Sequence, residues 1–467
     1  MKKKMFSVFL SIALAASLAA CGSSAGNTAV DAGKDNSGTS KQGSPDDVDL
    51  KELAANYDGE INIVLWGKDS IDPDKKERSR GWQFQRMADE YASQFDNVTI
   101  EYINQGSYDD VAEKIMAGAT ANDLPTAFIA EEASVKGFSG VAADIRDYVP
   151  SEVIQDFMPG LLVSMIDEND RLLAVPCARS LPVLYANQEM LDEAGWTIED
   201  IKTNEDMMQA AKAVYEATGK PGYIMFWDTD AWHWESEIYA DGGSVLSEDG
   251  QTVTFGKDND YVGAKFLEMV QEGLKEGYVV SPYGTPKPGD TRDELFTTGE
   301  AAMMLTSSNS MPKRADALAE SGYTMVTAVQ PAGEGGISMA GGGSNWMICE
   351  SASYEEKMIV GGYLAYISSA DCVMDMVENN GNMMVTTSAQ ESERGKALLT
   401  EKPYYQAVYD SIEYLHERPN TTSWVEMYTY AFDKLEQFSL NYETTDVRAM
   451  IDEIQQKFEQ IIADNAW

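Results

Sequence analysis

The sequence predicts an α/β fold with parallel strands, and three observations support this prediction. Short apolar runs alternate with longer segments in which apolar residues recur at helical spacing. The 467 residues provide enough chain for two or three domains. The composition is 43% hydrophobic and 10% aromatic, which is typical of a folded protein rather than of a disordered acidic tail.

The alternation begins near Gly59, where we expect the folded body to start. Residues 61 to 66 (INIVLW) form an apolar run between two glycines, which is typical of a buried strand. The segments that follow predict, in order, a helix over about 75 to 95, a strand over 98 to 103, a helix over 109 to 119 and a strand over 127 to 130.

The ends of these strands carry aromatic and acidic side chains. Ligands of parallel sheets bind at the carboxyl ends of the strands. Trp66, the segment 105 to 108 and the pair Glu131 and Glu132 all follow a predicted strand. We therefore expect three loops to converge on one site.

The charge balance excludes two classes of partner. With 35 basic and 77 acidic residues, the formal net charge is −42. Nucleic acid and anionic lipid headgroups repel such a surface. The chain has only two histidines and no CxxC or HExxH motif, so neither a metal nor another cofactor is expected.

Of the four cysteines, Cys21 lies near the N-terminus and the other three lie in the expected folded body. Cys177, Cys349 and Cys372 are expected to be buried small apolar residues, and a disulfide between two of them is the alternative.

The first residues predict export and a lipid anchor. Three lysines precede an apolar run that is too short for a permanent membrane helix and ends in the sequence LAAC. This sequence is similar to a bacterial lipobox. It predicts a signal peptide over residues 1 to 20 and a lipid, including palmitate, on Cys21; an ordinary secretory signal cut after Ala20 is the alternative.

Residues 21 to 57 are expected to be a flexible tether, because Ser, Gly, Asn and Asp dominate the first part of this segment. The protein would then be held at the cell membrane, on its extracytoplasmic face, by the lipid alone. We expect it to be a monomer.

Four sequence motifs occur in order along most of the chain. They are QGSY with LPTA (105 to 108, 124 to 127), RLLAVP with SLPVLYAN and LDEAG (171 to 176, 180 to 187, 191 to 195), FTTGEAAM (296 to 303) and GGGSNW (341 to 346). Together they resemble the extracellular solute-binding proteins of carbohydrate ATP-binding-cassette importers (solute-binding protein family 1), nearest the glycerol-3-phosphate-binding subgroup.

The resemblance implies a two-lobed periplasmic-binding-protein fold, with ligand in the cleft between the lobes and several chain crossovers. Lobe one would comprise residues 58 to 179 and 343 to 381, and lobe two residues 182 to 338 and 382 to 467. Residues 180 to 182, 341 to 343 and Gly381 would be hinge or crossover positions, although Gly381 is as well explained as an ordinary turn glycine.

Residue chemistry then selects candidate ligand-binding side chains. Sugars need hydroxyl partners and flat rings for stacking. The segment 227 to 235 holds three tryptophans and three acids, so at least one of its indoles is expected in the cleft. The candidates are Trp66, Tyr108, Glu132, Ser180, Trp227, Trp232, Trp234, Ser308, Gly343 and Trp346.

Several of these candidates have a second interpretation. Only one of Glu131 and Glu132 can face a ligand, and spacing favours Glu132. Trp346 either lines the cleft or fills the crossover. Arg179 either holds an anionic ligand or pairs with a carboxylate, the second being favoured.

The ligand class also has alternatives. The glycerol-3-phosphate subgroup carries a tyrosine and an arginine where this chain has Asn382 and Val425, and the nearest cation is Arg418. Without that arginine, a neutral mono- or oligosaccharide is favoured over glycerol 3-phosphate or a glycerophosphodiester. An extracellular glycoside hydrolase would also use tryptophans and two carboxylates. The leader and the ordered motifs favour a binding protein without catalytic residues, delivering its ligand to a membrane permease.

Overall fold

A computed structural model describes residues 44 to 72, 74, 79 to 227, 231 to 419, 421 and 423 to 464. The predicted signal peptide and Cys21 lie outside the described residues. The strands are β1 (Ile61–Gly67), β2 (Val98–Asn104), β3 (Ala127–Glu131), β4 (Val175–Ser180), β5 (Pro182–Asn187), β6 (Tyr223–Ile224), β7 (Val279–Val280), β8 (Met303–Ser307), β9 (Met325–Val329), β10 (Met339–Ala340), β11 (Gly342–Ile348) and β12 (Leu415–His416).

The α-helices lie between these strands and after them. They are α1 (Leu50–Asn56), α2 (Arg80–Ala92), α3 (Tyr108–Ala121), α4 (Ser151–Asp156), α5 (Gln188–Glu193), α6 (Asn204–Thr218), α7 (Trp232–Ala240), α8 (Val262–Glu276), α9 (Pro288–Thr297), α10 (Met311–Glu320), α11 (Tyr354–Ile367), α12 (Ala370–Asn380), α13 (Thr387–Glu391), α14 (Glu393–Glu401), α15 (Gln406–Asp410), α16 (Trp424–Asn441) and α17 (Val447–Asp464).

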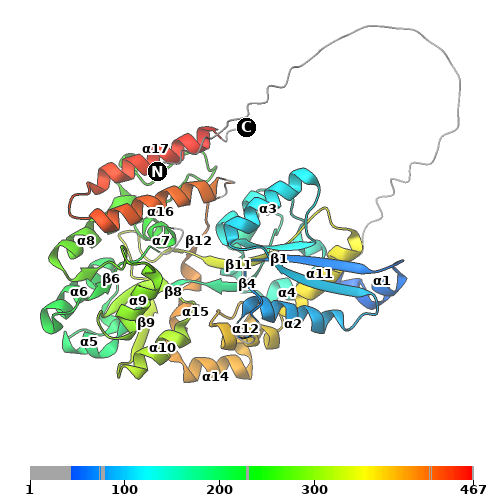
Figure 1. Ribbon diagram of the computed structural model, residues 1–467, viewed down its shortest axis with the longest axis horizontal. Helices are drawn as coiled ribbons and strands as arrows, with labels where there is room; N and C mark the ends of the chain where they lie inside the picture. Colours follow the sequence, from blue (N-terminus) through cyan, green and yellow to red (C-terminus); the bar gives the residue numbers. More distant parts are fainter. Residues whose placement is uncertain are drawn as a thin grey trace, which may run out of the picture. The chain divides into compact units, whose positions relative to one another are not determined.

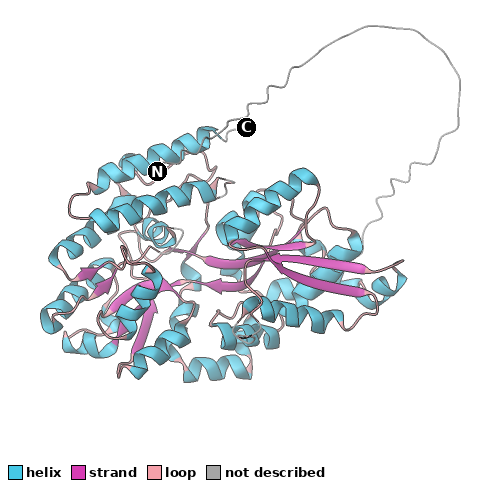
Figure 2. Cartoon of the chain, in the orientation of Figure 1, coloured by secondary structure: helices cyan, strands magenta, loops and turns pink. Residues whose placement is uncertain are grey.

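Two five-stranded sheets form the centres of two lobes (Figure 1). In lobe one the strand order is β2-β1-β3-β11-β4; β1 runs parallel to β2 and β3, whereas β11 is antiparallel to β3 and β4. In lobe two the order is β7-β6-β8-β5-β9. Figure 2 shows helices packed around the strands of both lobes. Both sheets are therefore mixed, because one strand of each, β11 in lobe one and β5 in lobe two, is antiparallel to both of its neighbours.

The chain crosses between the lobes at short buried connections. Only Leu181, fully buried, separates β4 from β5. A second crossover joins β10 to β11 at Gly341, where β10 also pairs with β12. The crossovers therefore fall at the segments 180 to 182 and 341 to 343, which the resemblance gave as hinge or crossover positions.

Three segment boundaries differ from the expectations. The folded part includes α1, which lies in the expected tether and contacts α11. Helix α2 begins at Arg80, where Ser79 caps its first turn, rather than near residue 75; residues 75 to 78 lie outside the description. Residues 382 to 402, expected in lobe two, bond to lobe one: Ser388 donates to Asp156 of α4 from its backbone N–H.

Gly381 ends α12 in the left-handed conformation, with φ of +72°. This is the ordinary turn role that was the alternative to a hinge. Cys177, Cys349 and Cys372 are free thiols, and the last two are buried, as expected of small apolar residues. Among the described helices, none combines the length and the apolar character that crossing a membrane requires.

Candidate ligand-binding site

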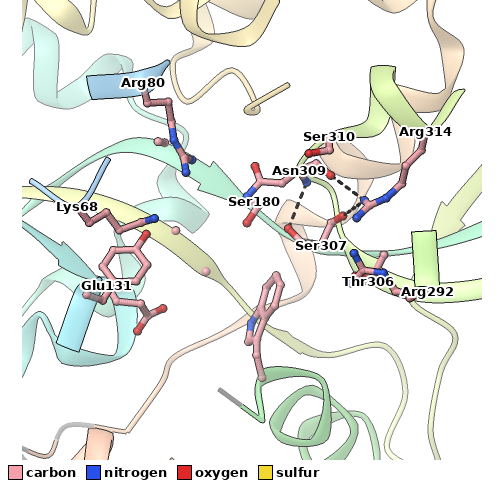
Figure 3. Close-up of a pocket in the computed structure, with 15 residues that line it drawn as sticks. Lys68, Arg80, Glu131, Ser180, Arg292, Thr306, Ser307, Asn309, Ser310 and Arg314 are labelled. Carbon is pink, nitrogen blue, oxygen red and sulfur yellow. Dashed lines mark hydrogen bonds between the residues drawn. The ribbon is translucent and has the colours of Figure 1, made fainter. Parts of the chain in front are cut away.

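A cavity of about 270 Å³ lies where loops of both lobes meet (Figure 3). Lobe one provides residues at the ends of β1, β3, β4 and β11 and at the start of α2 and α3. Lobe two provides the start of α7, helices α9 and α10, and the end of β8. The lining residues are Lys68, Arg80, Tyr108, Glu131, Ala178, Ser180, Trp232, Arg292, Thr306, Ser307, Asn309, Ser310, Arg314, Gly342 and Gly343.

Tyr108 stands on the lobe-one wall because the capping box of Ser107 and Asp110 begins α3 at this position. Its hydroxyl shares a hydrogen bond of 2.8 Å with the Ser344 hydroxyl. The Lys68 ammonium lies 4.6 Å from the centre of the Tyr108 ring. Burial raises the pKa of Tyr108, so its phenol is a neutral hydrogen-bonding group at physiological pH.

Glu131 is the acid that faces the cavity, which corrects the prediction of Glu132. Its Oε1 accepts a hydrogen bond of 2.8 Å from Arg418 Nη1, and its Oε2 accepts one of 2.7 Å from the backbone N–H of Ala133. Burial raises the pKa of Glu131, and Arg418 opposes that shift. The buried Arg418 also pairs with Glu235 of lobe two at 2.5 Å. Arg418 thus joins an acid of each lobe.

Glu132 turns the other way. It forms a buried ion pair with Arg179, whose Nη1 also donates to Asn345 Oδ1 at 2.9 Å. The pairing of Arg179 with a carboxylate confirms the favoured interpretation of that residue. The two glutamates diverge because a short 3-10 turn begins at Glu132, directly after β3.

Trp232 is the tryptophan that reaches the cavity from the segment 227 to 235. It is the first residue of α7, and its indole N–H donates to the carbonyl of Ala340 at 2.9 Å. A Cβ at Gly342 would lie 3.1 Å from the indole, so the glycine leaves room for the ring. The crossover strand and the indole therefore pack directly against each other.

Trp227 and Trp234 were predicted as cleft residues, but both are fully buried in the core of lobe two. Their indole N–H groups donate to Ser439 Oγ and to the carbonyl of Gly263. Each indole thus has a partner inside the lobe, which explains how three neighbouring tryptophans point in different directions.

Three further candidates also lie away from the cavity lining. Trp346 is fully buried on β11, 5.4 Å from the Phe84 ring in an edge contact, which is the filling role weighed as its alternative. Trp66 is partly buried and packs against the same core. Ser308 is buried, and its hydroxyl accepts a hydrogen bond from the backbone N–H of Leu181, so it holds the crossover instead.

The lobe-two wall contains residues that the sequence did not single out. Arg314 of α10 donates from Nε to Asp293 Oδ1 at 3.0 Å, and Arg292 of α9 pairs with the same oxygen at 2.9 Å. The Arg314 Nη1 also donates to the backbone carbonyls of Ser307 and Asn309. This arginine therefore fixes the turn between β8 and α10 that forms the wall.

A second cavity of about 340 Å³ continues from the first. The two cavities share the lining residues Arg80, Asn309 and Ser310. Asp69, Ser70, Asp72, Ser79 and Asn380 complete its lining. The site is therefore elongated along the boundary between the lobes.

A two-lobed α/β fold with a polar cavity at the crossovers is the architecture of a protein that binds a small solute. The family model described as bacterial extracellular solute-binding protein matches residues 86 to 403. The chain belongs to this family, as its four motifs predicted.

Curated relatives with similar sequences are named for two kinds of ligand, glycerol 3-phosphate and an arabinooligosaccharide. The sn-glycerol-3-phosphate-binding periplasmic protein UgpB of Brucella melitensis is 23% identical over 68% of this chain and 75% of the relative. The UgpB of Rhizobium meliloti is 24% identical, and the match spans 57% of its length. An arabinooligosaccharide-binding protein of Halalkalibacterium halodurans is 27% identical over 41% of this chain and 42% of its own.

Solved structures confirm the predicted fold. The sugar-binding protein MalE from Xanthomonas citri matches with a TM-score of 0.71 at 17% identity, over 87% of this chain and 98% of that one.

Proposed function

We propose that this solute-binding protein captures a mono- or oligosaccharide in the cavity between its lobes and delivers it to the membrane permease of an ATP-binding-cassette importer. The observation that carries the proposal is the cavity lining, which combines one indole, several hydroxyl groups and one carboxylate from both lobes. The names of the MalE neighbour and the arabinooligosaccharide-binding relative support this choice.

The lining matches the chemistry of a sugar. The face of Trp232 offers apolar contact to the C–H face of a pyranose or furanose ring. Ser180 and Ser307 offer hydroxyls that donate and accept, and Glu131 accepts from ligand hydroxyls. The adjoining second cavity favours an oligosaccharide over a single ring.

Closure of the lobes would distinguish the ligand-bound protein from the free protein. A ligand that contacts both walls binds the closed form more tightly and shifts the equilibrium toward it. The narrow crossovers at Leu181 and Gly341 are suited to this motion, because few residues must change conformation. The closed form would then dock on the permease.

A thermal-shift screen over neutral oligosaccharides and glycerol phosphates tests this proposal. A ligand at about 100 times its Kd stabilises the folded state by ~2.7 kcal/mol. Trp232→Ala should reduce the shift, whereas Trp196→Ala, which removes a partly buried indole outside the cavity lining, should leave it unchanged. Absence of any shift with all sugars would contradict the proposal.

Glycerol 3-phosphate or a glycerophosphodiester is the second candidate, favoured by the names of the Brucella and Rhizobium relatives. Arg418, the nearest cation to the missing subgroup arginine, is occupied by Glu131 and Glu235. A thermal shift with glycerol phosphates alone would reverse the order of the two candidates.

The protein is proposed to bind without turnover, since the matching family consists of binding proteins. Incubation of the purified protein with its best ligand should return that ligand unchanged. Release of a shorter glycan would instead indicate the glycoside hydrolase alternative.

We also propose a lipid anchor at Cys21 and a monomeric protein at the extracytoplasmic face of the cell membrane. The basic n-region, the apolar run and the LAAC sequence support the anchor. Labelling with a palmitate analogue should mark the wild type and not Cys21→Ala; equal labelling of both would contradict the anchor.

A further inference from the structure

The cavity has a charge opposite to that of the chain. The whole sequence has 77 acidic and 35 basic residues, yet the lining has four cations, Lys68, Arg80, Arg292 and Arg314, and one acid, Glu131. Figure 3 shows Lys68 and Arg80 on one side of the pocket and the two other arginines on the opposite side. A positive cavity in so acidic a body requires an explanation.

Each pair of cations shares a single carboxylate. On lobe one, Arg80 pairs with Asp69 Oδ1 at 2.9 Å and Lys68 lies 3.6 Å from the same oxygen. On lobe two, Arg292 and Arg314 both pair with Asp293 Oδ1. Two positive charges against one negative charge leave each of these basic pairs with one positive charge in excess.

Three of these four cations have donor groups to spare among the described residues, whereas Arg292 donates from all three of its nitrogens. Arg80 donates from Nε and pairs with Asp69 through Nη2, and Arg314 donates from Nε and Nη1, so the remaining terminal nitrogen of each has no hydrogen-bond partner in that part of the chain. The Lys68 ammonium lies 3.6 Å from Asp69 Oδ1, which is longer than an ordinary hydrogen bond. Polar groups in a cavity need partners, and charged donors are best satisfied by an anionic oxygen.

The carboxylate in the lining does not supply that anion. Glu131 is already paired with Arg418 and with the backbone N–H of Ala133. Burial lowers the pKa of Lys68 and Asp69 opposes that shift. An incoming anion would strengthen the charged form of this lysine and occupy the donors of both walls.

We propose that the ligand is a saccharide that carries an anionic group, a carboxylate or a phosphate ester, held between the basic pair of each lobe. This inference rests on the proposed function, because it concerns the same cavity. The two basic pairs carry charge of the same sign and repel each other when the cavity holds no anion. An anion between them removes that repulsion, so charge recognition and lobe closure are coupled.

The experiment compares glucose, glucuronate, glucose 6-phosphate and inorganic phosphate by calorimetric titration and thermal shift at matched ionic strength. We expect at least one charged sugar to bind about tenfold or more tightly than glucose, as charge-assisted hydrogen bonds predict. The comparison of glucuronate with glucose 6-phosphate shows whether the anionic group that binds is a carboxylate or a phosphate ester. Inorganic phosphate should raise the melting temperature relative to chloride.

Lys68→Met is the test variant, because Lys68 is partly exposed and anchors no backbone group. Lys212→Met is the matched control: Lys212 also pairs with one carboxylate, Glu276, and lies 5.7 Å from the centre of a tyrosine ring, Tyr278. The first variant should reduce the preference for the charged probe about tenfold, and the second should leave it unchanged.

The outcomes separate this inference from the proposed function. Binding of neutral oligosaccharides without any response to the charged probes would overturn the anion site and leave carbohydrate capture intact. A response to the charged probes that survives Lys68→Met would also overturn it. A response to phosphate without binding of any sugar would instead reject the carbohydrate ligand.

Discussion

Glu237 offers a sharp test of the structure, because it is an acid buried inside the helix that begins at Trp232. It is 1% exposed on α7, and its carboxylate accepts hydrogen bonds from Asn204 Nδ2 at 2.5 Å and Gln330 Nε2 at 3.2 Å. Burial raises its pKa from 4.5 to about 8. The folded state therefore keeps a proton that the unfolded state loses near pH 4.5.

The difference in the pKa of Glu237 between the folded and the unfolded state sets the direction and the magnitude of the pH effect on stability. The stability that Glu237 contributes is fully present below pH 4.5 and is lost as the pH rises toward 8. A shift of this size corresponds to at most about 5 kcal/mol, at ~1.4 kcal/mol per pH unit. Glu237→Gln stays neutral throughout and should remove this loss.

The assay is urea unfolding of wild type and Glu237→Gln across the window between pH 4.5 and pH 8. The other acids titrate in both proteins, so the difference between their curves isolates Glu237. The glutamine amide can also donate, and Asn204 Oδ1 and Gln330 Oε1 are buried acceptors without a partner. Glu205→Gln, an exposed substitution on neighbouring α6, controls for the lost charge. Parallel curves for wild type and Glu237→Gln would show that the pKa of Glu237 is not raised in the folded state.

Four further substitutions test the site and its supports. Trp232→Ala should weaken ligand binding at least ~5-fold in calorimetric titration, since one ring contact contributes about 1 kcal/mol or more; Trp234→Ala should instead lower the free energy of unfolding by about 3 to 5 kcal/mol and leave affinity nearly unchanged. Equal losses of affinity in both would contradict the placement of these indoles. Arg418→Met removes the cation that pairs with the buried Glu235 and the partly buried Glu131. It should cost about 3 to 5 kcal/mol of stability in urea unfolding, and an unchanged midpoint would argue against the bridge. Gly343→Ala should lower the melting temperature, because φ is +113° and a Cβ would lie 2.4 Å from the carbonyl oxygen of Ala178; an unchanged melting temperature would show that this strand relaxes freely.

Local patterns predicted the first lobe well. The strand expected over residues 61 to 66 is β1, the one over 98 to 103 is β2 and the one over 127 to 130 is β3. β1 and β3 are short and largely apolar, and β2 alternates apolar and polar residues. The mixed direction of the sheet could not be read in this way, because β11 enters it from a distant part of the chain.

The site was predictable where it lies in a motif or at a strand end. Tyr108, Ser180, Trp232 and Gly343 all line the cavity. The choice between Glu131 and Glu132 failed because alternation along a strand does not fix which face a following turn exposes. Lys68 follows β1 by one residue and could have been found with the same strand-end rule.

The arginines of the cavity could not have been found from spacing. Arg292 and Arg314 lie on separate helices, and only the fold brings both to Asp293. Arg80 begins α2, which the sequence placed earlier in the chain. Cations that lie far apart in the sequence form no recognisable motif. The positive charge of the cavity lining could therefore not be predicted from the sequence.

The central claim is that a solute bound between the lobes closes them. Small-angle X-ray scattering of the full chain, without and with the strongest ligand of the thermal-shift screen at saturation, tests this most directly. We expect a smaller radius of gyration in the presence of saturating ligand than in its absence. An unchanged radius of gyration for wild type at demonstrated saturation would contradict it.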